Sequence, residues 1–87
     1  MVPELPDYTC YLSAEVVSFV IGLPKDKQRK VFGLVERIAA SPEFISDYRT
    51  TDAKGRPIDN LLLEEFLFTY WIDHASKEVQ ITEILKV

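Results

Sequence analysis

Three side chains in the second half of this sequence have the chemistry for acid–base catalysis or for binding an anion. His74 is the only histidine among the 87 residues. Histidine is the side-chain type whose unperturbed pKa lies nearest neutral pH, so His74 is the one ready candidate for a general acid or base. Arg49 and Arg56 precede it in a polar stretch, and guanidinium groups bind phosphates and carboxylates. We interpret these three as candidate catalytic residues. The alternative is that all three are solvated charges in turns.

The composition gives little support for a nucleophilic cysteine or a metal site. The single cysteine, Cys10, lies in a β-prone run with no histidine nearby in the sequence, which favours a buried structural thiol over a nucleophile. One cysteine and one histidine do not provide a structural zinc site. We therefore expect no metal and no cofactor. The adjacent pair Glu64 and Glu65 is interpreted as turn charge, because neighbouring strand residues point to opposite faces and would not act together.

Charge is spread unevenly along the chain. Ten Lys and Arg residues stand against fourteen Asp and Glu residues, which gives a net charge of −4 and predicts weak non-specific binding to nucleic acid. A basic cluster nevertheless lies in the first half of a predicted helix. We interpret it as a candidate partner-binding surface that guides an acidic segment; the alternative is the solvated face of a helix. The cluster consists of Lys25, Lys27, Arg29 and Lys30.

The N-terminal third predicts a short strand and a short helix. Residues 1–7 hold two of the five prolines and predict an irregular lead-in, and residues 8–12 are β-prone. Ser13 offers an N-cap for a helix over 14–22, and Gly22 offers its end. The many β-branched residues leave a continued strand as the alternative. We expect the buried side of this helix to carry Val16, Val17, Val20 and Ile21.

The second predicted helix shows a clear amphipathic pattern. Pro24 suits its first turn, where a missing N–H group costs nothing, and Pro42 ends it near Ala40. Charged residues fill most of the side opposite the apolar one. The apolar stripe, with spacing i, i+3, i+4 and i+7, consists of Val31, Leu34, Val35 and Ile38.

The remainder of the chain predicts a polar connector followed by three strands. Residues 43–57 form the connector, with a turn signal around Gly55. Apolar and aromatic runs over 58–63, 66–73 and 78–86 predict strands, and polar residues between them predict turns.

The middle strand carries aromatic residues on both faces. Side chains alternate along a strand, so Tyr70 and Trp71 point to opposite faces and at most one of them belongs to the main core. The other could anchor a partner, so both are candidate partner-binding residues; packing under a loop or helix is the alternative. In the last strand, Ile84 breaks the alternation and predicts a β-bulge.

These elements predict a two-layer α+β fold in the order β-α-α-β-β-β. An antiparallel meander over 58–86 packs its inner face against two N-terminal helices. The length allows one domain, which we place over residues 1–87.

Three stretches carry a resemblance to a known family. Leu23-Pro24 opens a basic amphipathic helix, the run 68–73 reads Phe-Thr-Tyr-Trp-Ile-Asp, and the run 77–84 reads Lys-Glu-Val-Gln-Ile-Thr-Glu-Ile. In this order and spacing they resemble the RelE/ParE toxin superfamily over roughly residues 8–86. The resemblance implies the toxin of a bacterial type II toxin–antitoxin pair. Members of the superfamily cleave messenger RNA on the ribosome or inhibit DNA gyrase, and an antitoxin protein neutralises them.

The sequence departs from the ribonuclease members of that superfamily. The run 66–69 reads Phe-Leu-Phe-Thr where the resemblance leads us to expect an arginine, and the C-terminal run 84–87 has no Tyr or His. RNA cleavage requires a general base, a general acid and a cation near the phosphate. We therefore expect a toxin-like protein that binds an antitoxin and a cellular target without a complete ribonuclease site. The alternatives are an active ribosome-dependent mRNA endoribonuclease and an inert interaction or dimerisation domain.

Location and partners follow from these expectations. No apolar run approaches the roughly 18 residues of a membrane span, and the N-terminus has no basic region typical of a signal peptide. With a single cysteine, these features predict a small soluble cytoplasmic protein without a membrane partner. We expect an antitoxin partner, with gyrase or the ribosome and its mRNA as alternative targets and a homodimer as a further alternative.

Overall fold

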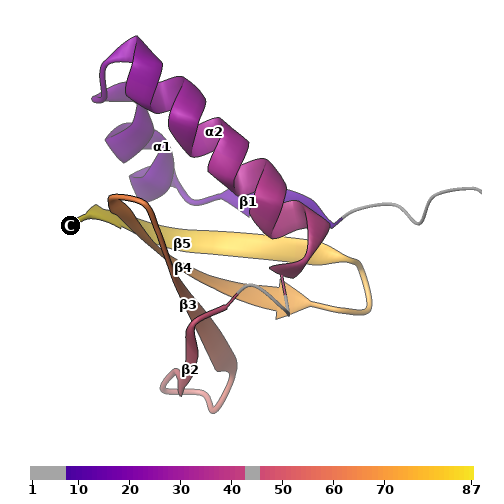
Figure 1. The fold of residues 1–87 in the computed structure, drawn as a ribbon. Coiled ribbons are helices and arrows are strands. Elements are labelled where there is room, and N and C mark those ends of the chain that lie inside the picture. The colour runs from indigo at the N-terminus through magenta and orange to yellow at the C-terminus, as the bar shows by residue number, and fades with distance from the viewer. Residues whose placement is uncertain (1–7, 43–45) are drawn as a thin grey trace, which may run out of the picture.

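Two helices cover one face of a five-stranded sheet in the computed structural model, which describes residues 8–42 and 46–87 (Figure 1). The predicted lead-in over 1–7 lies outside the described residues. The elements, in chain order, are β1 (Thr9–Leu12), α1 (Ala14–Ile21), α2 (Lys25–Ala40), β2 (Tyr48–Thr51), β3 (Pro57–Leu63), β4 (Phe66–Asp73) and β5 (Glu78–Lys86). This arrangement confirms the predicted two-layer α+β fold. None of the described helices is long and apolar enough to cross a membrane.

The sheet has the strand order β1-β5-β4-β3-β2. Strands β3, β4 and β5 form the predicted antiparallel meander, and β1 adds to its edge in parallel to β5. Strand β2 is a difference from the sequence prediction, which placed these residues in a connector. Its four residues are all exposed and pair antiparallel with β3, so backbone hydrogen bonds rather than apolar burial hold it. The predicted turn at Gly55 joins the two strands, with a φ of +80°.

The core lies between the two helices and the inner face of the sheet. In α2, Val31, Leu34 and Ile38 are buried and Val35 packs against them, which confirms the predicted stripe. The inner face of the sheet contributes the buried residues Leu61, Phe66, Phe68, Tyr70, Val79, Ile81 and Ile84.

Helix α1 has the predicted ends but a narrower buried side. The Ser13 hydroxyl accepts a hydrogen bond from the Val16 amide at 3.2 Å, and Gly22 follows the last helical residue. Val16 and Val20 are buried, whereas Val17 and Ile21 are 45% and 67% exposed, so the prediction that they point inward was wrong. The reason is geometric: each residue is turned by about 100° from the one before it, and this short helix buries one narrow stripe.

Strand β4 alternates as predicted. Phe66, Phe68 and Tyr70 are buried on the inner face, so Trp71 points to the outer face. The register with β5 shifts between Thr69 and Tyr70, which leaves one extra residue on β5. This bulge returns Ile84 to the inner face, where it is buried, as the broken alternation predicted.

The β3–β4 turn is formed by Glu64 and Glu65, and ion pairs tie it to α2. Glu64 has a φ of +54°, in the left-handed region that favours glycine. Lys30 Nζ lies 3.1 Å from Glu64 Oε1, and Lys27 donates a hydrogen bond to Glu65. The Glu64 carboxylate raises the pKa of Lys30, and the hydrogen bond from Lys27 lowers the pKa of Glu65. The interpretation of this glutamate pair as turn charge is therefore consistent with its position.

Candidate functional site

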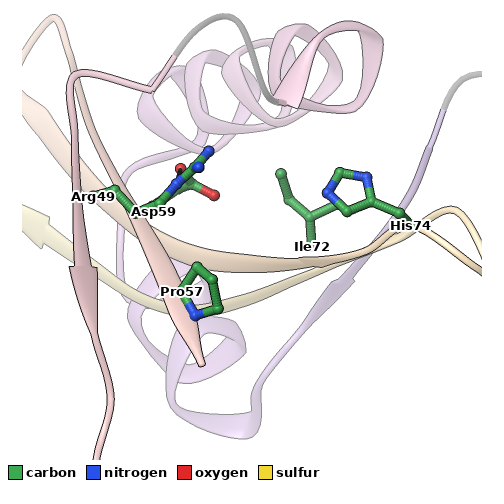
Figure 2. A pocket seen from close by; sticks show the side chains of 5 residues that line it. All are labelled: Arg49, Pro57, Asp59, Ile72 and His74. Atoms are coloured by element: carbon green, nitrogen blue, oxygen red, sulfur yellow. Dashed lines mark hydrogen bonds and ion pairs between the residues drawn. The ribbon is translucent and has the colours of Figure 1, made fainter. Parts of the chain in front are cut away.

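A pocket of about 200 Å³ opens on the inner side of the sheet, between β2 and the end of β4. Its lining contains two of the three candidate catalytic residues. Figure 2 shows the Arg49 and Asp59 side chains on one side of the pocket and Ile72 and His74 on the other. Pro57, at the start of β3, completes the lining. The topology thus joins residues that lie 25 positions apart in the sequence.

Strand pairing places an acidic and a basic side chain next to each other on one side of the pocket. Arg49 of β2 is the register partner of Asp59 of β3, and Asp59 pairs in turn with Tyr70 of β4. Arg49 Nε donates a hydrogen bond to Asp59 Oδ1 at 3.0 Å. The Asp59 side chain is 3% exposed and the Arg49 side chain is 56% exposed. A buried carboxylate therefore holds the inner edge of the guanidinium, while its remaining N–H groups stay accessible to an anion.

His74 stands across the pocket in contact with the N-terminal segment. The Tyr8 hydroxyl lies 3.2 Å from His74 Nδ1, and the two rings meet edge to face with centroids 6.1 Å apart. Lys77 Nζ lies 5.3 Å from the centre of the Tyr8 ring. These contacts fix the imidazole at the rim of the pocket, where it can donate or accept a proton.

Arg56 lies outside this pocket. Its guanidinium stacks over the ring of Trp71 with its central carbon 4.2 Å from the ring centre, and its Nε lies 2.9 Å from Asp52 Oδ2. The Asp52 carboxylate also accepts hydrogen bonds from the backbone N–H groups of Arg56 and Lys54. The hydrogen bond from the Arg56 backbone holds the pKa of Asp52 below its usual range. The structure therefore brings Arg49 and His74 together and leaves Arg56 apart.

The pocket can bind a small anion such as a phosphate or carboxylate. Arg49 supplies the positive charge, and His74 supplies a hydrogen bond and a titratable group. However, Asp59 balances the Arg49 charge, and the lining residues provide no second permanent cation. Phosphoryl transfer needs such a cation as well as an acid and a base. Among the described residues, no group of three His, Cys, Asp or Glu side chains could hold a metal ion.

Two solved structures share this architecture. A chain of the RelBE2 toxin–antitoxin complex from Mycobacterium tuberculosis matches with a TM-score of 0.80 and 13% identity, over 93% of this chain and 99% of that one. A chain of the archaeal RelE–RelB complex from Pyrococcus horikoshii OT3 matches with a TM-score of 0.72 and 17% identity, over 92% and 94%. The chain has the RelE toxin fold. No protein-family model and no curated protein matches its sequence.

Among the candidate partner-binding residues of this RelE-like chain, Tyr70 must be set aside. Its side chain is fully buried, and its hydroxyl donates a hydrogen bond to the Pro42 carbonyl at 2.9 Å. Burial, reinforced by the charge of Asp59, raises the pKa of this hydroxyl. Tyr70 is therefore a core residue, which leaves Trp71 as the candidate anchor of the pair. Trp71 remains half-buried on the outer face beneath Arg56.

The basic cluster of the RelE-like chain is divided by the turn at Glu64 and Glu65. Lys27 and Lys30 both contact Glu65, so their charges are partly balanced within the molecule. Lys25 and Arg29 are exposed. Sequence reasoning did not find this pairing, because Glu65 is 38 residues from Lys27 along the chain.

Asp59 is the pocket residue that sequence reasoning missed. The signal available was an acidic residue within an apolar strand run, Ile-Asp-Asn-Leu-Leu-Leu over 58–63. A buried carboxylate normally requires a charged or hydrogen-bonding partner, and Arg49 fills that role in the RelE-like chain.

Proposed function

We propose that this chain, as a single RelE-like domain over residues 1–87, is the toxin-like component of a bacterial type II toxin–antitoxin pair. Its partner would be an antitoxin protein, and its target a cellular assembly such as the ribosome with its mRNA, or gyrase. The observation that carries the proposal is the fold that this chain shares with chains of two toxin–antitoxin complexes. In each comparison the match covers more than nine tenths of this chain and of the matched chain.

The proposal assigns binding rather than RNA cleavage to this chain. The Arg49 charge is balanced by Asp59, which weakens its ability to stabilise a phosphorane-like transition state. The central run 66–69 carries no arginine, and the overall charge of −4 opposes close contact with RNA. These features support an incomplete ribonuclease site.

Induced expression in a bacterial host tests the proposal. We expect growth arrest when the chain is expressed alone, and recovery when the short gene beside its own gene is co-expressed. The two proteins should also co-purify as a stable complex. A harmless chain that finds no partner among its neighbouring gene products would contradict the proposal, and a harmless stable homodimer would favour the inert dimerisation domain.

One observation favours mRNA cleavage as a second candidate function. Arg49 and His74 line the same pocket, so an anion-binding group and a general acid or base face one space (Figure 2). Primer extension on mRNA after induction tests this function. Cleavage that is lost in Arg49→Ala and His74→Ala but retained in the control Arg56→Ala would support it. The absence of cleavage by the unaltered chain, or normal cleavage by both pocket variants, would exclude this site.

A further inference from the structure

Helix α2 has one side that packs on the sheet and one side that faces away from it (Figure 1). The residues on the side facing away are exposed, and we call them the outer stripe of α2. They recur every three or four positions, so they follow one face of the helix over about 22 Å. The outer stripe consists of Lys25, Asp26, Arg29, Phe32, Gly33, Glu36, Arg37 and Ala40.

The middle of the outer stripe combines a glycine with an exposed aromatic ring. Glycine is the least favourable residue after proline in the interior of a helix, yet a Cβ atom at Gly33 would meet nothing within 4 Å outside its own helix backbone. No neighbouring element of the same chain therefore requires a glycine here. Phe32 beside it is 48% exposed. A missing side chain next to an exposed ring allows a second helix to approach closely and to pack on the ring.

The charges of the outer stripe alternate in sign along the helix. Lys25, Arg29 and Arg37 are basic, whereas Asp26 and Glu36 are acidic. None of the ion pairs that join two described residues includes any of these five. An acidic segment lying along the stripe would meet its two acids, and a basic segment would meet its three bases. The pattern favours a partner whose charges also alternate.

A second copy of α2, lying antiparallel on the first, has the matching pattern. A two-fold axis between Phe32 and Gly33 places Arg29 level with Glu36 of the second copy, because both residues lie equally far from the axis. Seven residues return a helix to within about 20° of the same direction, so Arg29 and Glu36 both face the partner helix.

The same axis pairs a second set of charges. Asp26 and Arg37 are eleven residues apart, so they lie on the same flank of the stripe. In an antiparallel pair, Asp26 of one copy comes within about 3 Å of the level of Arg37 of the other. The two glycines then meet on this flank of the interface, and the two Phe32 rings meet on the opposite flank.

We propose that this chain forms a two-fold symmetric homodimer through the outer stripe of α2. The two Gly33 residues let the helices approach, the Phe32 rings pack together, and each of the two ion pairs forms twice. The stripe does not share the acidic excess of the chain, so its net charge of −4 is not concentrated at this interface. One helix pair covers less area than the roughly 1,200 Å² of stable complexes, so we expect a weak dimer. The inference goes beyond the proposed toxin–antitoxin role and does not depend on it.

Sedimentation velocity of the full chain over a range of micromolar to millimolar concentrations tests the inference. We expect a reversible equilibrium between monomer and dimer. Arg29→Glu alone and Glu36→Arg alone should each raise the dissociation constant about tenfold or more, because each places like charges level with one another. The double change Arg29→Glu and Glu36→Arg exchanges the two charges and should restore the dimer. A mixture of the two single variants should form a heterodimer more readily than either variant forms a homodimer.

Gly33→Leu tests the close approach of the helices. It should abolish the dimer while leaving the monomer folded, since the position is open in the monomer and leucine favours a helix more than glycine does. The matched control is Lys54→Glu in the β2–β3 turn, which changes the net charge as Arg29→Glu does at an exposed position outside the stripe. It should leave the dimer unchanged. Circular dichroism establishes that each variant is folded.

Three results would overturn the inference. The first is a chain that stays monomeric at millimolar concentration, and the second is a dimer that Gly33→Leu does not weaken. The third is a dimer that either charge reversal weakens but the double change does not restore. If the unaltered chain is monomeric and Gly33→Leu instead weakens binding of the neighbouring gene product, another protein occupies the stripe and the homodimer is excluded. Growth arrest and its relief test the toxin–antitoxin role separately, so a toxic monomeric chain would overturn this inference alone.

Discussion

Removal of the Arg49 side chain should destabilise the protein through the carboxylate that it leaves behind. Asp59 is 3% exposed and is held by Arg49 at 3.0 Å, so Arg49→Ala leaves a buried charge without its cation. Breaking a fully buried pair in this way costs about 3–5 kcal/mol. Because the Arg49 side chain is 56% exposed, solvent screens the pair, and we expect a smaller loss of about 1–3 kcal/mol.

Urea unfolding followed by far-UV circular dichroism measures this loss. Arg56→Ala is the matched control, since its ion pair with Asp52 is solvent-exposed and its removal should change stability less. The double change Arg49→Ala and Asp59→Asn removes the unpaired charge, so it should recover part of the lost stability. If Arg49→Ala costs no more than Arg56→Ala, or if Asp59→Asn recovers nothing in the Arg49→Ala background, Asp59 does not hold Arg49 electrostatically.

Further predictions concern the core and two titrating groups. Leu34→Ala should lower the free energy of unfolding by about 2–5 kcal/mol. The control Ile21→Ala should lower it much less, because Ile21 is exposed. Similar losses in the two variants would show that the α2 stripe does not face the core. Burial raises the pKa of the Cys10 thiol to about 11, so iodoacetamide should react slowly with the folded protein at pH 8 and rapidly in urea. The hydrogen bond from Lys27 lowers the pKa of Glu65 in the folded protein, so its ion pairs contribute their full stability above pH 4.5. This contribution is lost as the pH falls through the folded pKa of Glu65. In a plot of unfolding free energy against pH, Glu65→Gln should therefore show a smaller decrease at acidic pH than the unaltered chain.

The features that sequence predicted well are those that depend on local periodicity. The stripe through Val31, Leu34 and Ile38 repeats with the helical period, and it is buried as one face. The alternation of Phe66 and Phe68 with outward residues likewise repeats with the strand period. In both cases, burial on one side of an element imposes a pattern that the neighbouring sequence alone reveals.

The features that sequence missed depend on contacts between distant segments. Strand β2 has no apolar face, so nothing in its local pattern distinguishes it from a polar connector. The fate of Tyr70 was left open because alternation assigns opposite faces to Tyr70 and Trp71 without saying which face the helices cover. The pairing of Arg49 with Asp59 follows from the β2–β3 register, which the missed strand concealed.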